Sequence, residues 1–478
     1  MLKNNKTRVA FIWLGGAELD TLPLAYANIA ANTDAGLCEM RLFDLALGIP
    51  RREDLGREIA QFRPDIIGVS VPVIAVGRTI EAVREAKRAA PNALVLAGGG
   101  YVSAWPAGVM AHPEIDYAIR GEAEAAFGLF ISELRSGAPR WERVPGLVRR
   151  AAGGLAENPP AVVAELDSLA LPDYRFIRLD EYLRRGYRAA IGSVPGAPIQ
   201  TTRGCPYDCA FCTCPSINGA RVRHFSTAYM MRLIETLHRD FGIKWFNIID
   251  DNFTYDPEKA KDFCRAALRL KIPGLGFGNM NGIRMQHGDK ELWALMRRAG
   301  WEHFTVAPES GSERVLGLMK KRISLEETKN TVGDMRAAGL PVCGFFIIGY
   351  PGETREDLRQ TGRFMRYFDL VEIYVFQLLP GSPVFMEMLK SGEITEGSVP
   401  PVENYSSGRR GYVSKELSDA DLYRFMFAAR ILAILRHPGA ALWRMRKINF
   451  RRSVGYFFTM IRTLFRFALE ERARRRIK

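Results

Sequence analysis

Short apolar runs alternate with amphipathic stretches along the first part of the chain. Runs of Val, Ile, Leu and Ala with few polar interruptions are typical of strands buried on both faces of a parallel sheet. The stretches between them have the length and spacing of helices. The predicted strands are Val9–Leu14, Cys38–Asp44, Ile66–Val71, Ala93–Ala97 and Ile115–Ile119. This alternation predicts a doubly wound α/β domain over residues 1–135.

A second alternation of the same kind begins near residue 198. Its predicted strands are Ile199–Thr202, Trp245–Ile249, Leu275–Asn279, His303–Ala307, Gly344–Ile348 and Glu372–Gln377. Six such steps over residues 198–390 predict an open, partial (β/α)6 barrel, because a complete eight-fold barrel needs about 250 residues. The Pro-, Gly- and Ala-rich segment 136–197 is predicted to be a linker with a little local structure, and residues 391–478 are predicted to form a helical region.

The composition fits a folded protein with more than one domain. The chain has 478 residues, of which 47% are hydrophobic and 25% are charged. These values exclude a disordered, collagen-like or disulfide-rich protein. No window reaches the roughly 18 consecutive apolar residues of a transmembrane helix, and the first apolar run ends too early, at Leu14, for a signal peptide. We therefore expect a cytoplasmic protein.

The positive charge of the chain is concentrated at its carboxyl end. Residues Arg436–Lys478 carry 13 Lys and Arg against two Glu, a net charge of +11 out of +14 for the whole chain. Basic helices with bulky apolar residues can lie in the headgroup layer of an anionic bilayer. We therefore expect a peripheral contact with the inner membrane face, the alternative being that the apolar stripe packs on the barrel. The stripe consists of Val454, Phe457, Phe458, Ile461, Leu464, Phe465, Ala468 and Leu469.

The strongest local signal is the sequence RGCPYDCAFC. Of seven cysteines, four lie within ten residues, which is typical of a metal site rather than of a disulfide framework. Cys205, Cys209 and Cys212 form Cys-x3-Cys-x2-Cys, and three thiolates from one loop can bind three irons of a [4Fe–4S] cluster and leave the fourth iron open. The alternative is a four-thiolate zinc site completed by Cys214, for which the CTC spacing is unfavourable.

With this motif, the chain resembles the radical SAM superfamily over about residues 198–383. The resemblance implies that S-adenosylmethionine binds at positions that follow successive barrel strands, although a helix cap or a turn explains each position taken singly. It places Phe211 and Gly349 at the adenine, and Asp250 and Asp251 at the methionine amino group. It places Glu309 and Ser310 at the ribose and carboxylate, with Lys321 as a further candidate for the carboxylate.

Strand ends in the first domain extend the resemblance. Ser70 follows the third predicted strand, and Gly98, Gly99 and Gly100 follow the fourth, where missing side chains let a bulky nucleotide tail approach the backbone. These features, with the RGEAE segment Arg120–Glu124, resemble the Rossmann-like cobalamin-binding domain that precedes some radical SAM barrels. No histidine comes before His112, so the Asp-x-His-x-x-Gly loop of many cobalamin proteins is absent. This implies cobalamin without a histidine below the cobalt; the alternative is a vestigial domain without corrin.

The resemblance implies a cobalamin-dependent radical SAM enzyme, most simply a methyltransferase acting on an unactivated carbon of a small-molecule or lipid substrate. In that family, reduced cobalt takes a methyl group from one S-adenosylmethionine, and a second is cleaved at the [4Fe–4S] cluster to a deoxyadenosyl radical. This radical abstracts a substrate hydrogen, and the substrate radical takes the methyl group. Such an enzyme also needs an external one-electron reductant of the flavodoxin or ferredoxin type.

The same sequence features are compatible with other functions. With or without cobalamin, the radical could instead drive a rearrangement, cyclisation or dehydration, and a non-enzymatic iron–sulfur electron carrier or sensor is a further alternative. An RNA methylthiotransferase is excluded because it needs a second cluster in the first domain, where Cys38 is the only cysteine. We therefore expect no nucleic-acid partner, and the sequence assigns no catalytic acid or base.

Overall fold

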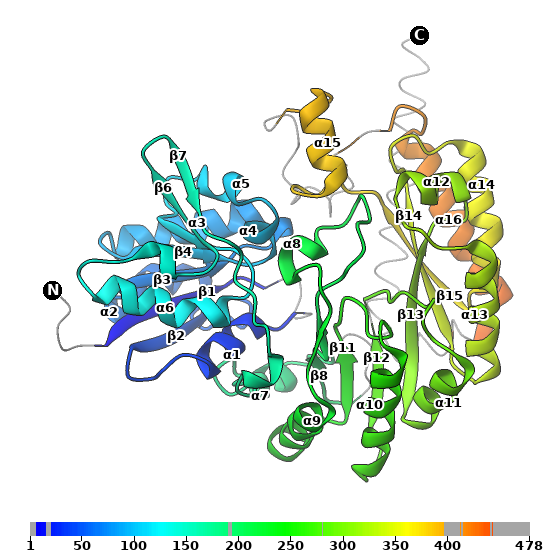
Figure 1. Cartoon of the computed structure of the whole chain (residues 1–478), viewed down its shortest axis with the longest axis horizontal. Coiled ribbons are helices and arrows are strands. Elements are labelled where there is room, and N and C mark those ends of the chain that lie inside the picture. Colours follow the sequence, from blue (N-terminus) through cyan, green and yellow to red (C-terminus); the bar gives the residue numbers. More distant parts are fainter. Residues whose placement is uncertain are drawn as a thin grey trace.

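Two α/β units lie next to each other in the computed structural model (Figure 1). The structure describes residues 6–15, 21–189, 194–279, 281–395, 412, 414–439 and 442. In Figure 1 the first unit, coloured blue to cyan, occupies the left half, and the second unit, coloured green to orange, occupies the right half. The short helix α8 (Cys214–Asn218) lies between them and contacts α4 (Gly100–Ala104) of the first unit.

The first unit is built on a seven-stranded sheet in the order β2-β1-β3-β4-β5-β6-β7. Its first five strands are parallel to one another, whereas β6 and β7 are antiparallel to their neighbours. The parallel strands are β1 (Thr7–Trp13), β2 (Cys38–Asp44), β3 (Ile66–Ser70), β4 (Leu94–Gly98) and β5 (Tyr117–Ile119). They overlap the five strands predicted from the sequence.

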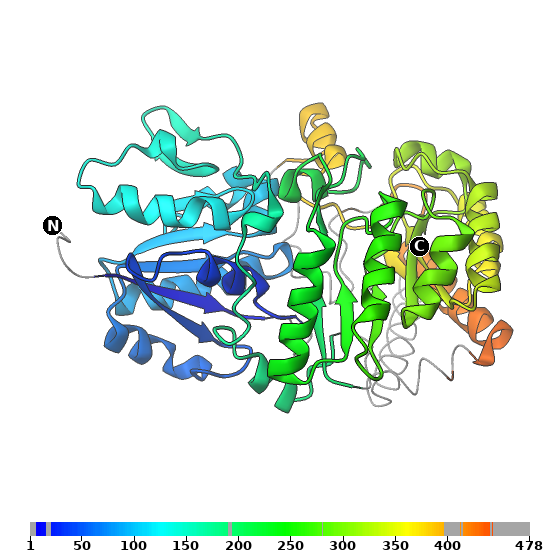
Figure 2. The same cartoon turned by 60° about the horizontal axis from the view of Figure 1, so that its bottom comes forward.

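Helices cover both faces of this sheet (Figure 2). Alternate residues of a strand point to opposite faces, and in β1 Val9 and Phe11 pack with side chains of α1 and α6, whereas Ala10 and Ile12 pack with those of α2 and α3. The helices of this unit are α1 (Leu24–Ala31), α2 (Leu55–Phe62), α3 (Val76–Ala89), α4 (Gly100–Ala104), α5 (Pro106–Met110) and α6 (Ala123–Arg135). The doubly wound arrangement is therefore confirmed.

The second unit is an open barrel of six parallel strands in the order β8-β11-β12-β13-β14-β15. Its strands are β8 (Gly196–Ile199), β11 (Trp245–Ile248), β12 (Gly276–Asn279), β13 (Trp301–Glu309), β14 (Val342–Ile348) and β15 (Leu370–Val375). The helices that follow them are α9 (Thr227–Phe241), α10 (Pro257–Arg269), α11 (Lys290–Arg298), α12 (Glu313–Leu318), α13 (Leu325–Ala337) and α14 (Arg355–Phe364). Figure 1 shows the longer of these helices along the outer side of the curved sheet.

The segment 136–197, predicted to be a linker, is structured and packed over its described residues, 136–189 and 194–197. Strands β6 (Leu147–Ala151) and β7 (Gly154–Glu157) extend the first sheet beyond β5. Further along, α7 (Leu179–Arg184) carries Tyr182, which is fully buried and donates a hydrogen bond of 2.9 Å to the carboxylate of Asp44. The sequence prediction missed this because proline and glycine interrupt the apolar residues of the segment, and because the partners of those residues lie in both units.

Two helices follow the barrel, α15 (Pro383–Ser391) and α16 (Asp419–Arg436). The amino-terminal part of α16 is buried through Leu422 and Met426. Among the helices that the structure describes, none is long and apolar enough to cross a membrane. The apolar stripe predicted for residues 454–469 lies outside the described residues.

Candidate cofactor sites

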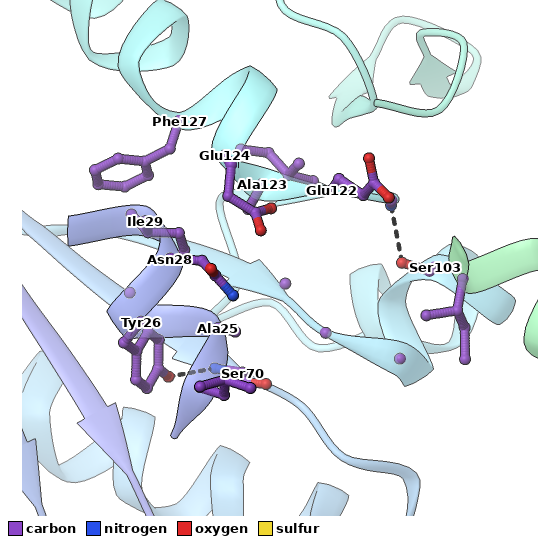
Figure 3. Close-up of a pocket in the computed structure, with 18 of the residues that line it drawn as sticks. Ala25, Tyr26, Asn28, Ile29, Ser70, Ser103, Glu122, Ala123, Glu124 and Phe127 are labelled. Carbon is purple, nitrogen blue, oxygen red and sulfur yellow. Dashed lines mark hydrogen bonds between the residues drawn. The ribbon is translucent and has the colours of Figure 1, made fainter. Parts of the chain in front are cut away.

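A cavity of about 330 Å³ lies at the carboxyl ends of the strands of the first sheet (Figure 3). Its walls come from β3, β4 and β5, from the helices α1 and α6, and from the second unit. Ligands of doubly wound sheets bind at this edge. The second unit contributes Gln200, Arg203, Ile217 and Asn218 to the lining.

The floor of the cavity is glycine backbone, as the sequence predicted. Ser70 and Gly98, Gly99 and Gly100 all line it. Gly99 has a φ of +99°, and a Cβ there would stand 2.7 Å from Ser70 Oγ and 3.1 Å from Val71 N. Only glycine therefore fits this position, and the bare floor can accept a bulky group such as the nucleotide tail of cobalamin.

Ser70 is held in place from below. Its backbone N–H donates a hydrogen bond of 2.7 Å to the hydroxyl of Tyr26, which in turn donates to the carbonyl oxygen of Ile12 at 2.8 Å. Burial raises the pKa of Tyr26, so this phenol stays protonated. Apolar side chains such as Ile29 and Phe127 line another part of the cavity, and no described lining residue is a histidine.

The three cysteines of the motif lie on one loop between β9 (Thr202–Arg203) and α8. Backbone hydrogen bonds fix this loop on both sides: Ala210 N donates to Met319 O, and Val384 N donates to Ala210 O, both at 2.9 Å. Cys209 is buried, while Cys205 and Cys212 are partly exposed. The loop thus presents thiols from a rigid backbone, which suits a cluster held by cysteine thiolates.

Cys214 lies closer to the other thiols than its spacing suggested. A hydrogen bond with Cys214 lowers the pKa of the Cys205 thiol to about 7, and the same thiol interactions raise the pKa of Cys214. In the described residues, no group of three or more His, Cys, Asp or Glu side chains has the geometry to hold a single metal ion. A zinc site needs four ligands converging on one ion, whereas each thiolate of a cluster binds its own iron.

The two aspartates after β11 hold the loops around the cysteines. Asp250 is only 1% exposed and accepts hydrogen bonds from the backbone N–H of Thr201, at 2.6 Å, and from its hydroxyl. Burial raises the pKa of Asp250 to about 7. Asp251 accepts from Gly204 N at 3.2 Å and from Asn218 Nδ2 at 2.8 Å. The oxygens of Asp250 are therefore committed to Thr201, a contact that the sequence did not show.

Glu309 and Lys321 form a buried ion pair beside the cysteine loop. Lys321 Nζ lies 2.8 Å from Glu309 Oε1, and the two residues are 7% and 6% exposed. Burial alone would lower the pKa of Lys321, but the Glu309 carboxylate outweighs it and the pKa is raised. The Lys321 ammonium also lies 5.9 Å from the centre of the Phe211 ring. The structure thus brings together three of the residues that the sequence proposed for S-adenosylmethionine.

Ser310 and Gly349 lie in the turns after β13 and β14. The Ser310 hydroxyl is buried, accepts from Ser312 N at 3.1 Å and lies 3.2 Å from Thr361 Oγ1, so it is occupied within the protein. Gly349 has a φ of +78°, and its N–H donates to the carboxylate of Glu353. Burial raises the pKa of Glu353 to about 8, and its Oε1 has no hydrogen-bond partner.

Sequence analysis gave no role to Arg284, which links the two sides of this site. Its guanidinium carbon lies 3.6 Å from the centre of the ring of Tyr207, which is part of the cysteine loop. The same side chain donates to the carbonyl oxygen of Lys321 at 2.7 Å. No local pattern marks this residue, since both partners are distant in the sequence.

Comparison with known proteins matches both units to families. Residues 12–131 match the B12 binding domain and residues 199–365 match the radical SAM superfamily. The chain is 30% identical over 319 residues to PH0819, an uncharacterized methyltransferase of Pyrococcus horikoshii, covering 66% of this chain and 67% of the relative. It is 27% identical to the cytidylyl-2-hydroxyethylphosphonate methyltransferase of Streptomyces wedmorensis, over 74% of this chain and 71% of that protein.

The fold is shared with a solved radical S-adenosylmethionine methyltransferase. The structure of TsrM from Kitasatospora setae superposes with a TM-score of 0.71 at 22% identity, covering 81% of this chain and 76% of that chain. In this chain the match to the B12 binding domain precedes the match to the radical SAM superfamily, which is the order predicted from the sequence. The chain belongs to the cobalamin-dependent radical SAM enzymes, and it is a methyltransferase of that family that uses a [4Fe–4S] cluster, S-adenosylmethionine and cobalamin.

Proposed function

We propose that this enzyme methylates an unactivated carbon of a small-molecule substrate at the junction of its two units. The observation that carries the proposal is that both cofactor sites share a wall. Helix α8 begins at Cys214, the last of the four neighbouring cysteines, and its residues Ile217 and Asn218 line the cavity of the first unit. When bound, cobalamin supplies a methyl carrier and the cluster supplies the electron that cleaves S-adenosylmethionine.

We propose that Cys205, Cys209 and Cys212 hold the cluster and that Cys214 does not. The fixed backbone of the loop and the thiol donor set support this assignment. Three thiolates leave one iron open, and an open coordination position distinguishes a reactive metal site from a structural one. The contact of Cys214 with its neighbours makes the Cys214 variant the decisive control for this proposal.

We propose that the side of the barrel facing the cysteine loop binds S-adenosylmethionine. Glu309, Lys321 and Phe211 meet there, so a carboxylate, an ammonium and an aromatic ring are available for the charged and aromatic parts of that cofactor. Asp250 acts indirectly, by fixing the position of Thr201. Its neighbour Asp251, which is partly exposed, fixes the turn at Gly204.

In the first unit, we propose that Ser70 and the Gly98–Gly100 floor take the nucleotide tail of cobalamin. The support is the bare backbone, the apolar walls and the position at the carboxyl edge of the sheet. The absence of histidine among the described lining residues agrees with cobalamin bound without a protein nitrogen on cobalt.

The test uses the purified protein reconstituted anaerobically with iron, sulfide and hydroxocobalamin. After reduction, S-adenosylmethionine should yield S-adenosylhomocysteine, the product of methyl donation, in a burst equal to the bound cobalt. Deoxyadenosine, the product of reductive cleavage, should form only when the cluster is present. Deoxyadenosine without any S-adenosylhomocysteine, in protein with stoichiometric cobalt, would contradict methyl transfer and favour cyclisation or rearrangement.

We also propose that a one-electron protein reductant and an anionic membrane surface contact this enzyme. The membrane proposal is supported by the carboxyl-terminal half of α16, where Ile434 and Leu435 are exposed, and by a groove between α14 and α16. The charged residues that line this groove are Arg359, Arg363, Arg366 and Arg436. Co-sedimentation with anionic but not neutral vesicles would support the contact; equal recovery with both, or no change on deleting residues 451–478, would contradict it.

A further inference from the structure

A buried group of charged side chains connects the two units beside the cavity. We call it the interdomain clamp: it consists of Glu122, Glu124, Arg203 and Arg223. These side chains are between 5% and 9% exposed. Both glutamates belong to the first unit and both arginines to the second. Two positive and two negative charges therefore neutralise each other across the boundary.

The contacts within the clamp are short and well oriented. Arg223 binds Glu122 through both terminal nitrogens, at 2.7 and 2.8 Å, which is the bidentate geometry of strong Arg–carboxylate pairs. Arg203 Nη2 donates to Glu124 Oε1 at 2.8 Å, and Arg203 Nη1 lies 3.5 Å from Glu122 Oε1. Every member thus has a charged partner in the other unit.

The barrel alone would not tolerate this arrangement. Strand β9 pairs antiparallel with β10 (Arg223–His224), and the register places Arg203 directly opposite Arg223. Like charges in directly opposed positions of a strand pair are destabilising, and buried charges need partners. Among the described residues, these arginines form ion pairs only with the glutamates of the first unit, so this strand pair needs that unit in its observed position.

On both sides the clamp is attached to a cofactor site through rigid backbone. Glu124 and Arg203 line the cavity, as Figure 3 shows for Glu124. Arg203 is separated from Cys205 only by Gly204, which has a φ of +97° and where a Cβ would stand 2.2 Å from Arg221 O. Movement of Arg203 is therefore transmitted to the first cysteine of the loop.

We propose that the interdomain clamp is a positioning device that fixes the distance and orientation between the cobalamin site and the cluster loop. This goes beyond the proposed function, because it concerns how the two sites are held and not which bond is made. It rests on the cofactors of the family and not on methyl transfer, so failure of methyl transfer would leave it standing.

The main test variant is Arg223→Gln, because Arg223 does not line the cavity and any effect on cobalamin must pass through the clamp. The matched control is Arg120→Gln, which removes an ion pair of 2.6 Å with Glu157 inside the first unit. Hydroxocobalamin binding is titrated by absorption, and the cluster is followed by its visible band. Pulsed electron paramagnetic resonance measures how strongly the reduced cluster speeds the relaxation of cob(II)alamin, which depends on their separation.

We expect Arg223→Gln to keep its cluster, to bind hydroxocobalamin at least about tenfold more weakly, and to lose most of the relaxation enhancement. The reason is that removing one partner of a buried ion pair leaves the other charge uncompensated. Arg223→Lys should recover part of both quantities, and the control should match wild type. The proposal would be overturned if Arg223→Gln showed the same relaxation enhancement as wild type. This holds also if the unfolding temperature of the variant falls while the enhancement is unchanged. If this variant does not fold, Glu124→Gln, which keeps the side-chain volume, is judged by the relaxation enhancement alone, because Glu124 itself lines the cavity.

Discussion

Replacing Gly99 by alanine measures how tightly the floor of the cavity is built. Gly99 has φ +99° and ψ 179°, a region that is essentially restricted to glycine and costs other residues about 1–3 kcal/mol. The added methyl would also stand 2.7 Å from Ser70 Oγ and 3.1 Å from Val71 N, an overlap that costs about 1–3 kcal/mol more. Together these terms predict that Gly99→Ala lowers the free energy of unfolding by about 2–6 kcal/mol.

The neighbouring glycine provides the matched control. Gly98 also lines the cavity, but it has no positive φ, and a Cβ there would meet nothing nearer than Ile119 O at 4.0 Å. Gly98→Ala should therefore change the free energy of unfolding by no more than about 0.5 kcal/mol. Its methyl group would nevertheless occupy space at the floor, so we expect it to weaken the binding of hydroxocobalamin.

The assay combines thermal unfolding of the cobalamin-free protein, followed by circular dichroism, with anaerobic titration of hydroxocobalamin. Gly99→Ala should lower the unfolding temperature by about 2–6 °C, because 478 residues at about 2.1 cal/mol/K each give an unfolding entropy of about 1 kcal/mol/K, whereas Gly98→Ala should leave it unchanged. An unchanged unfolding temperature for Gly99→Ala would refute the strain argument. Wild-type cobalamin affinity in Gly98→Ala would refute the assignment of the floor to the cofactor tail.

Three further predictions concern the cluster, a buried carboxyl and the cobalt. Alanine variants of Cys205, Cys209 and Cys212 should each lose the visible band of the cluster and all deoxyadenosine formation, and Cys214→Ala should keep both; the reverse pattern would make the ligand assignment wrong. Burial raises the pKa of Glu353 from 4.5 to about 8, so the folded state retains a proton that the unfolded state releases, and stability falls as pH rises between these values. Glu353→Gln should remove this pH dependence, so its free energy of unfolding in urea should rise relative to wild type by about 2 kcal/mol between pH 6 and pH 8. If the free energies of unfolding of the two proteins change in parallel with pH, the carboxyl of Glu353 is not protonated in the folded state. The cob(II)alamin form should show no superhyperfine splitting from a protein nitrogen, and such splitting would place a histidine on cobalt.

Local sequence patterns predicted the sheets well because buried parallel strands are apolar over their whole length. The strand Cys38–Asp44 has the predicted bounds, and the ends of β3 and β4 lie where the glycines and Ser70 indicated. The first barrel strand was predicted a few residues too late, at Ile199–Thr202. Proline is an ordinary signal for the end of a strand, but β8 contains Pro198 and is an edge strand, where a missing N–H is tolerated.

Long-range pairing of polar groups could not be predicted from one sequence. Arg203 and Glu124 are 79 positions apart, and neither stands in a periodic pattern that would indicate burial. For the same reason the sequence did not show that the carboxylate of Asp250, a candidate for the cofactor, accepts hydrogen bonds from Thr201. The sequence indicated which residue types lie near the site, and only the fold determines which of them face one another.

The packed segment after residue 135 also determines which part of this protein could move between genes as a unit. A fragment cut at residue 135 would leave β5 without its antiparallel neighbour β6, and an unpaired strand edge invites aggregation. It would also remove Tyr182, the buried donor to Asp44. Recombination that exchanges cobalamin-binding domains among relatives should therefore succeed only when the crossover lies beyond α7. The exchanged domain then keeps β6 and β7 at the edge of its sheet and the buried Tyr182.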